Sequence, residues 1–112
     1  MDYTETNKLI AEFDGMTNHH NDKSMMVRKT PLGNDVVSIE ELDYDKSWDC
    51  LMPVIEKIEK LGYKFEKNYQ RVDKDWQSLI VKGNDILYQE FNNDSLKSSY
   101  YVVVEFIKNQ NK

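Results

Sequence analysis

The sequence is poor in the residues that build disulfides and metal sites. It has one cysteine, Cys50, and its only two histidines, His19 and His20, are adjacent. A single thiol cannot form an internal disulfide, and it fits a reducing compartment better than a secreted scaffold, so we expect a cytoplasmic protein. A metal site would have to be built from His19, His20, Asn21, Asp22 and a distant acid, without the cysteine pair or the i, i+4 histidines that common zinc sites use. We therefore expect a polar loop there and no cofactor.

The chain also lacks segments that point to membranes, phosphates or nucleic acid. Its first residues are acidic where a signal peptide is basic, and no stretch approaches the ~20 apolar residues that span a bilayer. Only four of its 112 residues are glycine, and no glycine-rich phosphate loop occurs. Fifteen basic against twenty acidic residues give a net charge of −5, which disfavours binding to DNA phosphates. We expect no membrane contact, and nucleic acid is a disfavoured partner.

What is present predicts one small α+β domain. The length and the 39% of hydrophobic residues are enough for one core, so we expect a single domain over 1–112. Apolar residues at helical spacing predict helices over 2–14, 47–62 and 96–107, and alternation predicts three strands within 63–92. The predicted fold is a three-stranded antiparallel meander packed against two main helices plus a short N-terminal helix.

The segment 17–46 has no clear period. The runs SMMVRKT at 24–30 and DVVSIEE at 35–41 could be short strands, with turn residues between them. An irregular connection of this length is unusual in a compact domain unless it is functional or mobile. Two interpretations therefore stay open for 17–46, a long mobile loop and a peripheral hairpin.

The helix over 47–62 contains a proline near its start. In one interpretation Ser47 or Asp45 caps the helix and Pro53 kinks it after the first turn. In the other, the main helix begins near Met52 and Pro53 occupies the first helical position, where proline is tolerated. Both interpretations bury Trp48.

Acidic residues gather immediately before this helix. Their spacing matches no EF-hand loop, and the simpler interpretation is a solvated acidic face near a positively polarised helix N-terminus. The functional interpretation is a patch that binds a basic surface of another protein. The candidate partner-binding residues are Glu40, Glu41, Asp43 and Asp45.

Aromatic residues of the predicted sheet allow a different function. Interleaved with basic residues, these aromatic residues could stack the bases of single-stranded nucleic acid. The strands also need an apolar face to receive the helices, and we favour this core role for the aromatic residues. The sequence thus predicts a non-enzymatic protein-interaction module, with single-stranded nucleic-acid binding as the alternative. The aromatic residues are Tyr63, Phe65, Tyr69, Trp76 and Tyr88, and the basic ones are Lys64, Lys67 and Arg71.

Three segments resemble a known group of proteins: NKLIAEF at 7–13, SWDCLMPVIEKIEKLG at 47–62 and VVEFIK at 103–108. They are similar to a family of short uncharacterised proteins of Bacteroidota and their phages or mobile elements, and the resemblance implies a genomic setting rather than a reaction. Where such relatives tend to carry a second tryptophan this chain has Cys50, which indicates a packing position rather than a nucleophile. Where they end in Trp-Tyr, this chain has Asn109 and Gln110.

Overall fold

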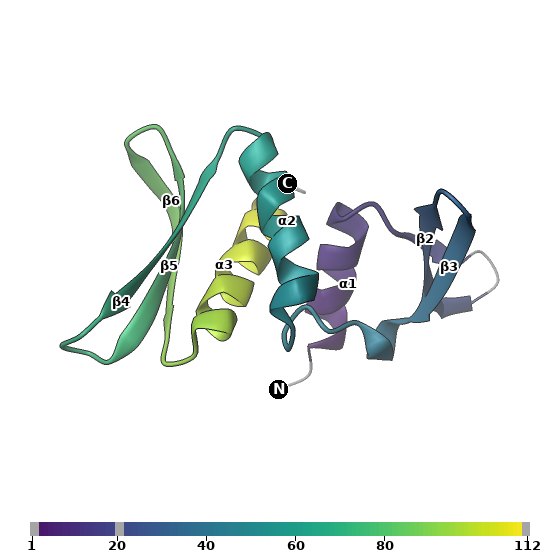
Figure 1. The fold of residues 1–112 in the computed structure, drawn as a ribbon, viewed down its shortest axis with the longest axis horizontal. Coiled ribbons are helices and arrows are strands. Elements are labelled where there is room, and N and C mark those ends of the chain that lie inside the picture. Colours follow the sequence, from purple (N-terminus) through teal and green to yellow (C-terminus); the bar gives the residue numbers. More distant parts are fainter. Residues whose placement is uncertain (1–2, 20–21, 111–112) are drawn as a thin grey trace.

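The computed structural model describes residues 3–19 and 22–110. In this part the chain is α+β, with three α-helices and two three-stranded antiparallel sheets. The sheets lie at opposite ends of the longest axis, with the helices between them, and the molecule extends over 49 × 29 × 27 Å (Figure 1). In chain order the elements are α1 Thr4–Phe13, β1 Thr17–His19, β2 Asp22–Thr30, β3 Gly33–Ser38, the 3₁₀ helix η1 Ile39–Glu41, α2 Trp48–Lys60, β4 Lys64–Gln70, β5 Asp75–Lys82, β6 Asp85–Asn92 and α3 Ser95–Gln110.

The strands β4, β5 and β6 form the meander that the sequence predicts. Ile80 of β5 pairs with Phe65 of β4 and with Tyr88 of β6, so these three side chains share one face of the sheet. That face packs on α3, where the ring of Phe106 lies edge-on to Tyr88 with 6.1 Å between centroids. The alternation of apolar and polar residues in these strands therefore reflects a sheet with one face covered by a helix.

The C-terminal helix forms although its YYVVV run has a high strand propensity. It lies against the sheet on one side and against α1 and α2 on another, so residues around most of its circumference are buried (Figure 1). Small polar side chains let it approach the sheet closely, since the hydroxyl of Ser78 lies 2.7 Å from that of Ser98 and 3.1 Å from that of Ser99. Burial on several sides outweighs the local propensity.

Helix α2 begins at Trp48 and continues through Pro53. The first of the two interpretations therefore holds for the start of this helix, with the proline past the first turn, where it has no N–H to donate to the carbonyl of Asp49. Ser47 is the N-cap residue, but its side chain makes no capping hydrogen bond. Trp48 is only partly buried at the edge of the core, and the ammonium of Lys67 lies 4.3 Å from its ring centroid.

The predicted single meander is incomplete, because β1, β2 and β3 form a second sheet. Within it, β2 and β3 make a hairpin, and β1 pairs with the other edge of β2. Among its described side chains Met26 alone is buried, so the alternation that marks a covered strand is weak here. No helix among the described residues is long and apolar enough to cross a membrane.

Candidate functional site

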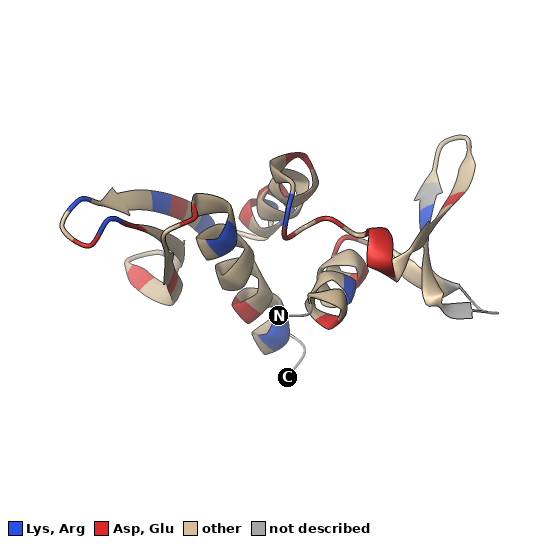
Figure 2. Cartoon of the chain, turned by 90° about the horizontal axis from the view of Figure 1, so that it is seen from below, with Lys and Arg blue, Asp and Glu red and all other residues tan. Residues whose placement is uncertain are grey.

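A cavity of about 270 Å³ opens between the N-terminal sheet, the segment 39–46 and the start of α2. We call it the acidic cavity, because five carboxylates line it beside an apolar floor. Figure 2 shows acidic residues over η1 and along the segment that leads to α2. The carboxylates belong to Asp14, Asp35, Glu41, Asp43 and Asp49, and the remaining lining residues are Met16, Arg28, Val37, Leu42, Tyr44, Cys50 and Pro53.

The register of the N-terminal hairpin places two strands on the cavity. Arg28 of β2 is opposite Asp35 of β3, and Met26 is opposite Val37. Residues two apart on a strand point to the same face, so Asp35 and Val37 both line the cavity while Val36 points away and is 49% exposed. The inner face of this sheet therefore forms one wall of the site.

Asp14, Tyr44 and Arg28 form a polar cluster at that wall. The Arg28 guanidinium lies 3.2 Å from Asp14 Oδ2, and it also donates to the Tyr44 hydroxyl at 3.4 Å. The Tyr44 hydroxyl in turn donates to Asp14 Oδ2 at 3.3 Å. Burial of the phenol and the adjacent Asp14 charge raise the pKa of Tyr44 to about 12. At neutral pH the phenol is therefore a neutral donor to Asp14.

The cavity consequently has an excess of negative charge. Among the described residues, Arg28 is the one basic residue of the lining, and its guanidinium is already bound to Asp14. The remaining four carboxylates are on exposed residues, and an apolar floor lies beneath them. An aliphatic stem that ends in an ammonium or guanidinium group matches both features, because it buries methylene groups and keeps its charge among the carboxylates.

The four predicted partner-binding residues divide between two sites. Glu41 and Asp43 line the acidic cavity, whereas Glu40 and Asp45 line a second cavity of about 320 Å³ on another side of the same segment. In a 3₁₀ helix successive side chains project about 120° apart, so the neighbours Glu40 and Glu41 face different directions. A following turn, in which the Lys46 and Ser47 amides donate to the Asp43 carbonyl, separates Asp43 from Asp45.

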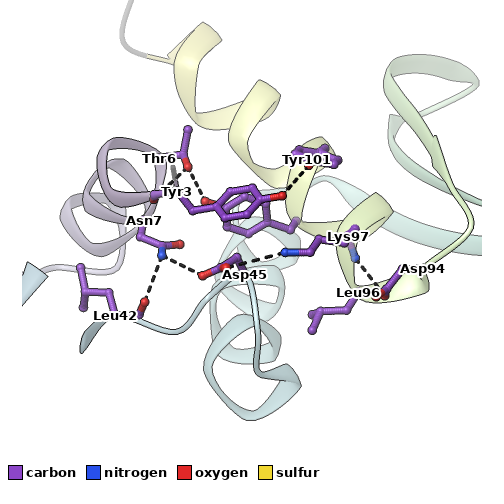
Figure 3. A network of polar contacts seen from close by, with 10 residues as sticks. Tyr3, Thr6, Asn7, Leu42, Asp45, Asp94, Leu96, Lys97 and Tyr101 are labelled. Carbon is purple, nitrogen blue, oxygen red and sulfur yellow. Dashed lines mark hydrogen bonds and ion pairs between the residues drawn. The ribbon is translucent and has the colours of Figure 1, made fainter. Parts of the chain in front are cut away.

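Asp45 is buried, with 3% exposure, and it links three parts of the chain (Figure 3). Its Oδ1 accepts a hydrogen bond of 2.9 Å from Asn7 Nδ2, and its Oδ2 lies 3.7 Å from the Lys97 ammonium, which also sits over the ring of Tyr3. Asn7 Nδ2 donates in addition to the Leu42 carbonyl at 3.0 Å. Asp45 thus ties α1 and the segment 39–46 to α3, which is a structural role.

Two candidates from the sequence concern chemistry rather than binding. The side chains of His19 and His20 lie outside the described residues, and among the described ones no group of three His, Cys, Asp or Glu could hold a metal ion. Cys50 is exposed at the acidic cavity. The described lining of this cavity contains no histidine that could act as the base of a cysteine nucleophile.

The aromatic residues of the meander also divide into two groups. Tyr63, Phe65 and Tyr88 pack against the core, and Tyr63 lies edge-on to Phe106 at 4.8 Å. Tyr69 and Trp76 form a cross-strand pair at the far end of β4 and β5, with 5.1 Å between their ring centroids. Base stacking would therefore have to use this distal pair, because a helix side chain covers the inner group.

The sequence did not indicate Asp14, Asp35 or Arg28 as site residues. Each lies outside the acidic stretch. The hairpin register places Arg28 opposite Asp35 at the cavity, and Asp14, the residue after α1, joins them through its ion pair with Arg28. A single sequence has no local signal for such a contact. Comparisons with family models, with curated proteins and with solved structures find no match for this chain.

Proposed function

We propose that this protein is a non-enzymatic interaction module whose acidic cavity binds a basic segment of a partner protein. The observation that supports this best is the described lining, in which five carboxylates and several apolar side chains accompany one basic residue that is already paired. Charge of one sign at a cavity attracts an oppositely charged partner and speeds its association. In this proposal Glu41 and Asp43 contact the partner, whereas Asp45 stabilises the fold.

Three further elements of the proposal rest on the sequence. The likeness of 7–13, 47–62 and 103–108 to the Bacteroidota and mobile-element family supports a phage-related accessory role. The lone thiol of Cys50 supports a cytoplasmic location. The net charge of −5 supports a basic protein partner over a nucleic acid.

A matched pair of double variants tests the proposal. Glu41→Gln with Asp43→Asn removes two charges from the cavity, and Glu56→Gln with Glu59→Gln removes two from the exposed face of α2. Tagged wild type and both variants are used to purify partners from the native host, with mass spectrometry of the captured proteins. We expect a basic protein that is depleted at least tenfold by the cavity variant and retained by the α2 variant. Equal capture by both variants would contradict the proposal.

A further inference from the structure

The strand β3 forms an outer edge of the N-terminal sheet, directly beside the acidic cavity. The strand order is β1-β2-β3, so within the described part of the chain β3 pairs with β2 on one side only. Its residues 33–36 are all exposed. An unpaired strand edge presents a row of backbone donors and acceptors that can pair with another chain.

The hairpin register identifies which backbone groups face outward. Thr30 and Gly33 flank a two-residue turn and are therefore a hydrogen-bonded pair. Hydrogen-bonded and non-hydrogen-bonded pairs then alternate along the hairpin, so Asp35 and Val37 bond to β2, whereas Asn34 and Val36 direct their N–H and C=O groups away from it. The side chains alternate in the same way, and it is Asp35 and Val37 that line the acidic cavity.

The other three edges of the two sheets are less suited to pairing. β4 pairs regularly with β5, but it carries Lys64, Glu66 and Lys67, and such charges on an edge strand disfavour pairing with another chain. β1 has three residues, and its register with β2 is irregular. β6 contains an irregularity opposite Ile80 and Val81, and such bulges disfavour further pairing. β3 is regular over its whole length and has one charged side chain, Asp35, which points toward the cavity.

On this basis, and resting on the proposed function, we infer that the partner segment binds as an extended strand added antiparallel to the outer edge of β3. Its backbone bonds to Asn34 and Val36, and every second side chain, a lysine or arginine, enters the acidic cavity beside Asp35. Strand addition of this kind takes its affinity from main-chain hydrogen bonds and its specificity from the alternate side chains. The charge of Asp35 and its four neighbouring carboxylates selects a basic segment and repels an acidic one.

Backbone-methylated peptides test this geometry on the unaltered protein. The probe is a fluorescein-labelled octapeptide of alternating Lys and Thr, followed by fluorescence polarisation. In the proposed register the lysines face the cavity and their N–H groups point to solvent, while the threonine N–H groups point to β3. We expect N-methylation of the threonines to weaken binding at least tenfold more than N-methylation of the lysines. Equal binding of the two methylated peptides, or no binding of the parent peptide, would overturn the inference.

A protein variant separates strand addition from the charge of the cavity. Val36→Pro removes an outward N–H without removing a bond to β2, and Val36→Thr retains that N–H as the matched control. We expect Val36→Pro, but not Val36→Thr, to weaken binding of the parent peptide at least tenfold. Both variants should unfold at similar temperatures. If the Glu41 and Asp43 charges matter but Val36→Pro binds like wild type, the proposed function stands and strand addition is wrong.

Discussion

The two sheets share one topology, three antiparallel strands in sequence order, but they are packed in opposite ways. The C-terminal sheet has α3 on one face and buries Ser78 and Ile80 completely beneath it. The N-terminal sheet exposes residues 33–36 and buries Met26 alone among its described side chains. The helix over the C-terminal sheet buries apolar side chains and so stabilises the fold, whereas the inner face of the N-terminal sheet forms a wall of the acidic cavity. We therefore expect stability to depend on the C-terminal half and binding on the N-terminal one.

The largest expected effect concerns the aromatic centre of the C-terminal half. Phe106 is fully buried, and its ring contacts Phe13 of α1, Tyr63 of the connection between α2 and β4, and Tyr88 of β6. Phe106→Ala should lower the free energy of unfolding by about 3–5 kcal/mol, measured by urea denaturation. Phe91→Ala, at a side chain that is 53% exposed, is the control and should cost less than about 1 kcal/mol. Similar losses for both variants would show that the packing against α3 does not dominate stability.

A smaller effect on stability should distinguish Asp45, which we assign a structural role, from Asp43, which we propose contacts the partner. Asp45→Ala leaves the buried Asn7 amide without one acceptor and Lys97 without its carboxylate, so it should cost about 1–3 kcal/mol of unfolding free energy. Asp43→Ala, at an exposed residue of the acidic cavity, should change the free energy of unfolding by less than about 0.5 kcal/mol but weaken binding of the alternating Lys and Thr peptide. Thermal unfolding and fluorescence polarisation measure the two properties. Loss of stability in both variants would mean that the acidic stretch acts as one structural unit.

The smallest effect is visible only in alkali. The folded pKa of Tyr44 is about 12 and its unfolded value is 10.0, so the unfolded chain loses this proton first as the pH rises. The contribution of Tyr44 to stability is therefore fully present below pH 10 and is lost as the pH rises through the folded pKa. Urea denaturation at pH 9 and pH 11 should show a smaller decline for Tyr44→Phe than for wild type. Equal declines would indicate that the phenol is free to ionise in the folded state.

The same contrast explains how much the sequence could predict. Phe65, Ile80 and Tyr88 alternate with polar residues because one face of their sheet is covered, and that alternation is legible in the sequence. In the sheet around Val36, Met26 is the one buried residue among the described side chains, so the alternation is weak and the sequence left two interpretations open for 17–46. Tyr100 shows the reverse case, since burial on several sides of α3 forms a helix from residues that prefer strands.

The candidate site was predictable only as a local concentration of charge. The acidic stretch is visible in the sequence, but its division between two cavities depends on the 3₁₀ turn at Ile39–Glu41 and on the turn that buries Asp45. Asp14 and Asp35 join Glu41 only through tertiary contacts, which have no local signature. The composition of the acidic stretch thus predicted the negative charge of the site, and the fold determined which carboxylates line the same cavity.

The position of Cys50 has a practical consequence. It is the only cysteine of the chain, and its thiol is exposed at the wall of the acidic cavity. A maleimide fluorophore or nitroxide added to the wild-type protein would therefore attach at one place, without any engineered residue. The chain thus has a built-in reporter position, from which occupancy of the cavity could be followed by quenching or by line broadening.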